Sequence, residues 1–226
     1  MSENSPSTRY LTQTNNFAYL AIALVLLLFG LAVTHELGIA LGEVVVEAAV
    51  LLALATAVWS MRNDRQWHAT RLGLLGALLV LLATRAWLIH AGLDLLWNGL
   101  LLVYLILTSW SAMRLVLFSG PVDWNKIVGS FCIYLLLGFI WATLYSMLAQ
   151  YRPYAFHGLP DSGWYENFPN LIYFSFITLT TAGYGDITPV TPMGHFLAIM
   201  EAVIGQFYLA VLVASLVGSI LSSRPK

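Results

Sequence analysis

A polar, glycine-bearing segment lies between two long apolar runs near the carboxy terminus. It reads Thr178-Leu179-Thr180-Thr181-Ala182-Gly183-Tyr184-Gly185-Asp186. In hydrocarbon every backbone N–H and C=O needs a partner, so non-helical backbone survives at membrane depth only where it is buried in protein or faces water. Gly183 and Gly185 indicate such backbone, because alternating glycines adopt positive φ without a Cβ clash and let successive carbonyls turn to one side. Together with the Thr181 hydroxyl, this column of oxygens can replace the hydration shell of a cation.

Membrane-spanning helices must position this segment. The chain has 226 residues, of which 59% are hydrophobic and 9% are charged, whereas soluble domains carry about a quarter charged residues. A spanning helix needs about 20 apolar residues, within a range of about 17–25. Six stretches qualify, namely 17–33, 44–60, 72–90, 95–118, 127–149 and 193–221. We therefore expect an all-α membrane protein with six transmembrane helices in a lipid bilayer.

A short helix over 169–179 is predicted to lead into the polar segment. Pro169 suits the first turn of this helix, where a missing N–H costs nothing. Eleven residues at about 1.5 Å each reach only about halfway across the hydrocarbon, so the helix is re-entrant rather than a seventh span. Its carboxy-terminal end carries the negative end of the helix dipole, which stabilises a partly dehydrated cation.

The polar segment resembles the selectivity filter of potassium channels. Filters of that family read TVGYG, and this chain has Thr181-Ala182-Gly183-Tyr184-Gly185 followed by Asp186. The resemblance covers roughly the last hundred residues, as an outer helix, a re-entrant pore helix, a filter and an inner helix. It implies a homotetramer in which four chains surround one axis and K⁺ binds to Thr181, Ala182, Gly183 and Tyr184. Ala182 stands where the family most often has Val or Ile, so a weakly selective monovalent cation channel is the alternative.

Several side chains are predicted to support the filter. Tyr173 and Phe174 fall where the family carries bracing aromatic residues, and Tyr173 can bond to Asp186 across the filter. Thr180, directly before the ion-binding residues of the filter, is assigned to the same group. Ile177 stands where some members place a carboxylate behind the filter.

Glu201 is a second source of a carboxylate near the filter. It lies about two turns into the inner helix, and an intramembrane carboxylate is a functional candidate by default. A protonated Glu201 can donate a hydrogen bond to the supports of the filter. The alternatives are a structural bond to a neighbouring helix and a position facing the cavity, where it would attract cations.

The inner helix carries a candidate hinge and a candidate cavity wall. Gly205 follows Gly185 by twenty residues, where the family's hinge glycine falls. Because glycine in a helix interior costs about 1 kcal/mol relative to alanine, either a bend or close helix packing is expected there. Helical spacing puts one further set on a single face, predicted to line the cavity: Gln206, Ala210, Val213 and Val217.

The chain divides at a linker. We expect a cytoplasmic tail over 1–16, a four-helix domain over 17–118, a linker over 119–126, a pore domain over 127–221 and a tail over 222–226. Within the pore domain the outer helix is 127–149, the outer loop 150–167, the pore helix 169–179, the filter 180–186 and the inner helix 193–221. Gly120 and Pro121 break the preceding helix, and Asp123 can cap the next one.

Charges in the first four helices argue against voltage sensing. A voltage sensor needs several basic residues that move through the field, but Arg114 is the only basic residue in 95–118. Glu47 and Arg85 lie at matching depths near the outer ends of their helices, which predicts an ion pair. This pair either holds the four helices together or takes part in gating.

Basic residues in the loops predict the orientation. If the amino terminus is cytoplasmic, eight of the ten basic residues lie inside, as the positive-inside rule requires. The eight are Arg9, Arg62, Arg65, Arg71, Arg114, Lys126, Arg224 and Lys226. Both termini are then cytoplasmic, the Asp186 end of the filter is outside, and the cell membrane is the expected location.

Other classes of protein find less support. The five histidines are scattered, none is followed by another at i+4, and no nucleophile–base set is visible, so no enzyme is predicted. His157 suits a solvated loop better than a pH sensor. No inverted repeat indicates a transporter, and an intact filter argues against a non-conducting subunit. The net charge of −1 gives no sign of a nucleic-acid partner. We expect K⁺ in the filter, no organic cofactor and no soluble ligand-binding domain.

Overall fold

A computed structural model describes residues 16–36, 50–57, 65–85, 91–118, 124–161 and 164–222. Its helices are α2 (Asn16–Glu36), α4 (Arg65–Arg85), α5 (Ala91–Phe118), α6 (Trp124–Tyr151), α7 (Trp164–Leu179) and α8 (Pro192–Ser222). Residues 50–57 are helical as well. Two short strands, β1 (Phe156–His157) and β2 (Thr188–Pro189), complete the described part. The all-α membrane fold predicted from the hydropathy pattern is the fold observed.

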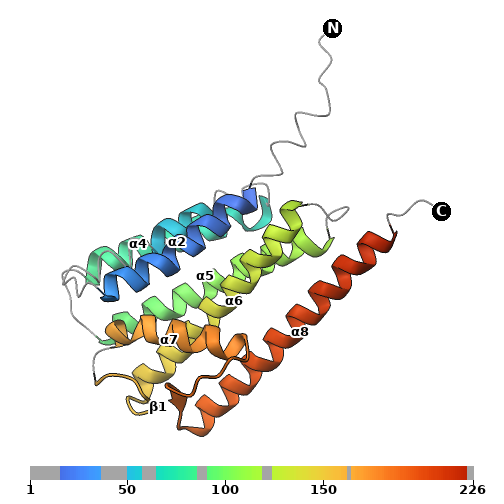
Figure 1. Ribbon diagram of the computed structural model, residues 1–226. Helices are drawn as coiled ribbons and strands as arrows, with labels where there is room; N and C mark the ends of the chain where they lie inside the picture. Colours follow the sequence, from blue (N-terminus) through green and yellow to red (C-terminus); the bar gives the residue numbers. More distant parts are fainter. Residues whose placement is uncertain are drawn as a thin grey trace.

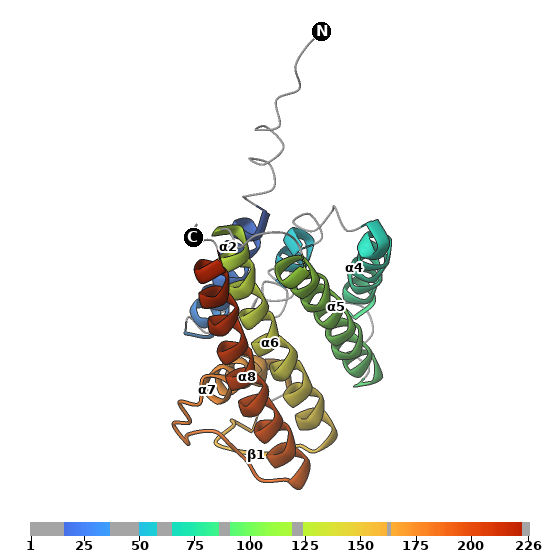
Figure 2. The same cartoon turned by 90° about the vertical axis from the view of Figure 1, so that its right-hand side faces the viewer.

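Helix α6 is the centre of the molecule. It contacts α2, α5, α7 and α8, and Figure 2 shows it running between α5 and α8. Two glycines permit this close packing, because a Cβ on Gly129 would lie 2.8 Å from Val116 and one on Gly138 would lie 2.5 Å from the ring of Phe176. The sequence therefore places its smallest residues where α5 and α7 approach α6 most closely.

One apolar core joins the first helices to the later ones. It includes Leu20 of α2, Leu78 of α4, Leu101 of α5, Leu136 of α6 and Ile172 of α7. Polar contacts reinforce the joint, since the Phe17 carbonyl of α2 accepts a hydrogen bond from the Cys132 thiol of α6 at 3.4 Å. The two parts of the chain thus share a core, and the division at 119–126 stays a prediction, with residues 119–123 outside the described part.

Three of the described helical segments are long and apolar enough to span a membrane. They are Gly92–Val116, Trp124–Tyr151 and Pro192–Ser215, and two shorter apolar helical segments cover Phe17–Val33 and Ala69–Thr84. The first residues of α2 and the last residues of α8 lie at the same end of the bundle (Figure 1). This arrangement suits an even number of crossings.

Helix α4 begins seven residues before the predicted start at Leu72. Arg71, predicted to lie in a cytoplasmic loop, is therefore part of the helix and is fully buried. The prediction was wrong because hydropathy locates only the apolar part of a helix, whereas Arg65 and its polar neighbours also have good helix propensity.

Helix α7 begins at Trp164, so Pro169 lies inside the helix and not in its first turn. The helix tolerates Pro169 because this residue removes only one N–H hydrogen bond near the amino-terminal end. The earlier start is stabilised by Glu166, whose negative charge in the first turn interacts favourably with the positive end of the helix dipole. The 16 residues span about 24 Å at 1.5 Å per residue, which is still shorter than a membrane-crossing helix. Figure 1 shows α7 lying across α6, with one end near α8.

Candidate functional site

The backbone of the polar segment alternates in handedness. Thr181, Gly183 and Gly185 have φ of 58°, 53° and 82°, at every second position. This confirms the positive φ predicted for the two glycines. Residues 180–186 are all exposed in the single chain, and Tyr184 is 75% exposed. The segment is therefore accessible in the single chain.

The end of α7 turns directly into this segment. The Thr181 N–H donates to the Thr178 carbonyl at 2.9 Å, and the Ala182 N–H donates to the Ile177 carbonyl at 2.9 Å. This pair of bonds is the Schellman motif, which places the residue after the helix in the left-handed region. Thr181 occupies that position, at a cost of about 1–2 kcal/mol relative to glycine. Its positive φ could not be predicted from the sequence, because helix capping, rather than residue type, imposes it.

The predicted support Thr180 lies at the same helix end. Its hydroxyl donates to the Phe176 carbonyl at 2.7 Å. The Thr180 hydroxyl therefore satisfies a carbonyl of the last helical turn. It supports the following residues only through their covalent connection to this helix end.

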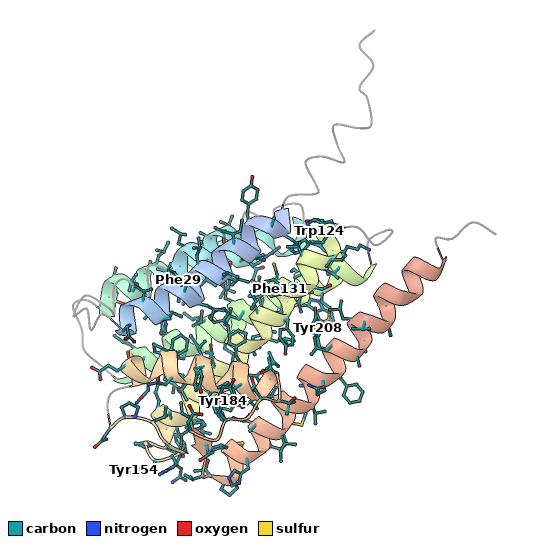
Figure 3. All side chains as sticks on the ribbon, in the orientation of Figure 1. Phe29, Trp124, Phe131, Tyr154, Tyr184 and Tyr208 are labelled. Atoms are coloured by element: carbon teal, nitrogen blue, oxygen red, sulfur yellow. The ribbon has the colours of Figure 1, made fainter. Side chains whose placement is uncertain are left out.

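Helices α6 and α8 hold the end of α7 from two sides. The Leu179 carbonyl accepts a hydrogen bond from the Tyr134 hydroxyl of α6 at 3.3 Å. On the other side, a Cβ added to Gly205 of α8 would lie 2.6 Å from the same carbonyl oxygen. Of the two interpretations of Gly205, close packing is present in the structure, and the hinge stays a prediction. Tyr208, which stacks on Tyr134 with ring centroids 5.9 Å apart, lies between α8 and α6 (Figure 3).

Glu201 contacts both α6 and α7. Its side chain is completely buried, with Oε2 2.5 Å from the Tyr145 hydroxyl of α6 and Oε1 2.5 Å from the Ser175 hydroxyl of α7. Full burial between these helices contradicts the cavity-facing alternative. The sequence did not indicate Tyr145 or Ser175, although both are hydroxyl side chains within apolar runs, the signal that could have marked them as partners of a buried carboxylate.

The Asp186 end of the segment is fixed by Tyr173 and by the loop predicted over 150–167. The Tyr173 hydroxyl donates to Asp186 Oδ2 at 2.7 Å, as predicted. This bond holds the pKa of Asp186 below its ordinary value. Strand β1 of the outer loop pairs antiparallel with β2, just beyond Asp186, and a Cβ on Gly158 would collide with the Asp186 carbonyl oxygen.

An aromatic cluster links this outer loop to α6 and α7. The rings of Tyr145, Phe156 and Phe174 meet edge-on, with centroids 4.9 to 5.6 Å apart. Phe174 of α7 thus packs against Tyr145 of α6 and Phe156 of the outer loop. His157, next to Phe156, is exposed.

Among the described side chains, the predicted cavity face of α8 is exposed. Gln206, Ala210 and Val213 are exposed, while the side chain of Val217 is outside the described residues. Larger apolar side chains on α8 are exposed as well, namely Phe196, Ile199, Val203, Phe207 and Val211. The proposed Glu47–Arg85 pair also falls outside the described side chains and stays a prediction.

The fold and the site together define an all-α membrane protein in which a short helix ends in a left-handed, exposed loop between two long apolar helices. Residues 131–222 match a family described as ion channel. This segment, which forms less than half of the chain, is thus similar to the ion-channel family.

Two relatives, both from Caenorhabditis elegans, are potassium channels by name. The small conductance calcium-activated potassium channel-like protein 3 is 36% identical over 85 residues, which cover 37% of this chain and 12% of that protein. The potassium voltage-gated channel protein shk-1 is 35% identical over 92 residues, which cover 41% of this chain and 16% of that protein. The chain thus matches less than a fifth of either relative's length. No solved structure matches the chain.

Proposed function

We propose that this protein is a homotetrameric channel that conducts K⁺ passively across the membrane. The observation that carries the proposal is the alternation of positive φ at Thr181, Gly183 and Gly185, directly after the carboxy-terminal end of α7. Such alternation lets successive carbonyls face one side, and rings of carbonyls from four chains replace the water around the ion. Conduction then needs neither a catalytic residue nor an organic cofactor.

The exposed surfaces of the single chain support assembly. Each chain carries one filter, so several copies must meet for a ring of oxygens to form. The filter and the apolar stripe of α8 are both exposed, and an apolar stripe of this size is typical of a contact surface. In the proposed tetramer α8 lines the central cavity with Gln206, Ala210 and Val213, and the termini are cytoplasmic.

A weakly selective monovalent cation channel is the second candidate. Ala182 favours it, because alanine fills less space behind the filter than the Val or Ile of the TVGYG-type sequence. The same carbonyl geometry would then bind K⁺ and Na⁺ with less discrimination.

A flux assay on purified protein in liposomes tests the proposal. Wild-type protein should release K⁺ down its gradient, and Ba²⁺ should block the release. Gly183→Ala should abolish the flux, because alanine is strained at φ 53°. Gly30→Ala, at a helical glycine of α2 with open space around it, should leave the flux unchanged. Flux of equal size from Gly183→Ala protein and wild type would overturn the assignment of the filter.

A further inference from the structure

Glu201 lies in a polar network whose protons can be counted. The network has three short contacts: Tyr145 hydroxyl to Glu201 Oε2, Ser175 hydroxyl to Glu201 Oε1, and Ser175 hydroxyl to the Gly138 carbonyl at 2.8 Å. Each contact needs one proton between its two oxygens. Tyr145 and Ser175 carry one hydroxyl proton each, and the Gly138 carbonyl carries none.

An ionised Glu201 leaves this network one proton short. If Ser175 donates to the carboxylate, its contact with the Gly138 carbonyl has no proton. If Ser175 donates to Gly138 instead, two oxygens face each other 2.5 Å apart without a proton between them. A buried carboxylate without a cation is also costly. The described groups that face Glu201 are hydroxyls, from Tyr145 and Ser175, with Tyr134 further away on α6.

A protonated Glu201 satisfies every contact. Its Oε1 proton goes to the Ser175 oxygen, the Ser175 proton goes to the Gly138 carbonyl, and the Tyr145 proton goes to Oε2. We propose that Glu201 is held neutral and acts as a positioning residue. Its proton begins a chain of hydrogen bonds, here called the relay, that runs from Glu201 of α8 to Ser175 of α7 and on to the Gly138 carbonyl of α6. The proposal rests on the proposed function only for its consequence at the filter.

The relay sets the register of α8 against the pore helix. Glu201 meets Ser175, and Gly205, four residues later, meets Leu179, four residues after Ser175. Since residues four apart share one face of a helix, both contacts lie along a single seam. This seam ends at the residue before Thr180, so a shift of α8 along α7 moves the start of the filter.

Infrared spectroscopy of the full chain in liposomes tests the protonation directly. A protonated carboxylic acid has a C=O band separate from the carboxylate bands. Glu201→Gln should remove such a band, whereas Glu166→Gln, at an exposed carboxylate in the first turn of α7, should not. A wild-type spectrum from which Glu201→Gln removes only carboxylate bands would overturn the proposal.

Conservative and non-conservative variants test the positioning role. Glu201→Gln keeps a donor for Ser175 and an acceptor for Tyr145, so K⁺ flux should stay within about twofold of wild type. Glu201→Leu leaves the hydroxyls unsatisfied and should lower the flux by about tenfold or more. Equal flux from both variants would contradict the relay.

The two readouts separate the proposals. A Glu201 acid band without K⁺ flux in the wild type would leave the relay standing and remove the proposed function. Flux without that band would remove the relay and leave the channel. If Glu201→Leu fails to assemble, Ser175→Ala provides the second test, because it breaks both Ser175 links and should shift the frequency of the Glu201 acid band.

Discussion

The glycines of this chain differ in how closely other atoms approach them, and this difference determines whether an alanine substitution stabilises or destabilises the protein. Gly205 faces the Leu179 carbonyl at a distance that excludes a Cβ, whereas Gly99 of α5 has nothing within 4 Å. Both residues are inside helices, where alanine is intrinsically favoured by about 1 kcal/mol. Packing therefore opposes the substitution at one position only.

We predict opposite effects of alanine at these two glycines. Gly205→Ala should destabilise the protein by about 1–3 kcal/mol, because the obstructing atom is backbone and cannot move aside cheaply. Gly99→Ala should be neutral or stabilising by up to about 1 kcal/mol. Thermal unfolding of the purified protein measures both, and a loss of stability of similar size in both variants would contradict the seam between α7 and α8.

The depressed pKa of Asp186 predicts that the Asp186 end of the filter loses stability at acid pH. Its pKa is depressed in the folded state by the Tyr173 hydroxyl, so the bond stabilises this end above the ordinary carboxyl range. That stabilisation is lost as the pH falls through the depressed value. In Tyr173→Phe the pKa should return toward its ordinary value, and flux should decline at a higher external pH than in wild type.

The control for this measurement is Tyr154→Phe. Tyr154 lies in the outer loop and its side chain is 84% exposed. Its variant should follow the wild-type pH profile. Identical acid profiles for all three proteins would show that the Tyr173–Asp186 bond has no part in the stability of the filter.

At the residue scale, local rules anticipated some of the site. Gly183 and Gly185 were predicted because only glycine adopts positive φ freely. The positive φ of Thr181 and the partners of Glu201 were not predicted, because a helix cap imposes the first and a three-helix contact the second. Tyr145 lies 56 residues from Glu201 in the chain, and no periodicity connects positions on two different helices.

Among the elements, the short sheet beside Asp186 could not be expected from the sequence. Strands of two residues leave no pattern, yet β1 pairs with β2, and the Val190 N–H donates to the Ala155 carbonyl at 2.9 Å. Gly158 is required beside this sheet, because it has a φ of 84° and touches the Asp186 carbonyl. The outer loop therefore fixes the residue that closes the filter.

Gly158→Ala should open this sheet. A Cβ would collide with backbone, and the residue would be strained at its positive φ. Hydrogen exchange of the Val190 amide should become about tenfold faster or more, as expected when opening becomes easier by about 1.4 kcal/mol. Gly92→Ala, at a glycine of α5 with open space, should leave that exchange rate unchanged. An unchanged rate in Gly158→Ala would show that the loop does not depend on this contact.

The single basic residue of α5 predicts that opening of the channel depends only weakly on voltage. Arg114 is its only basic residue, and one charge crossing the whole field contributes only about 2.3 kcal/mol per 100 mV. Open probability in planar bilayers should therefore change gradually between negative and positive voltages. A steep, sigmoidal activation curve would contradict this prediction.

Hydropathy located the helices well but not their ends. The apolar centres of α2, α5, α6 and α8 were predicted within a few residues, because lipid requires long apolar runs. Helices α4 and α7 begin earlier than expected, since their first residues are polar or aromatic and are held by helix propensity and tertiary contacts. Pro169 indicated a start that the structure places five residues upstream.

At the scale of the whole molecule, one shared core and one unpartnered face stand out. The first helices pack on α6 of their own chain, where residues of α2, α5 and α6 belong to the same core. Exposed apolar side chains such as Phe29 of α2 point away from it (Figure 3). The exposed residues of α8 and the filter residues 180–186 are not part of this core. We therefore expect the copies of a tetramer to meet through α8, with the first four helices at the periphery.

The reversal potential of the reconstituted protein tests the central claim most directly. Purified protein in a planar bilayer would separate equal concentrations of K⁺ and Na⁺. A potassium-selective filter predicts a large reversal potential of the sign set by K⁺ diffusion, and Ba²⁺ should abolish the current. A Ba²⁺-sensitive current that reverses near zero would contradict potassium selectivity and favour the weakly selective channel that Ala182 suggests.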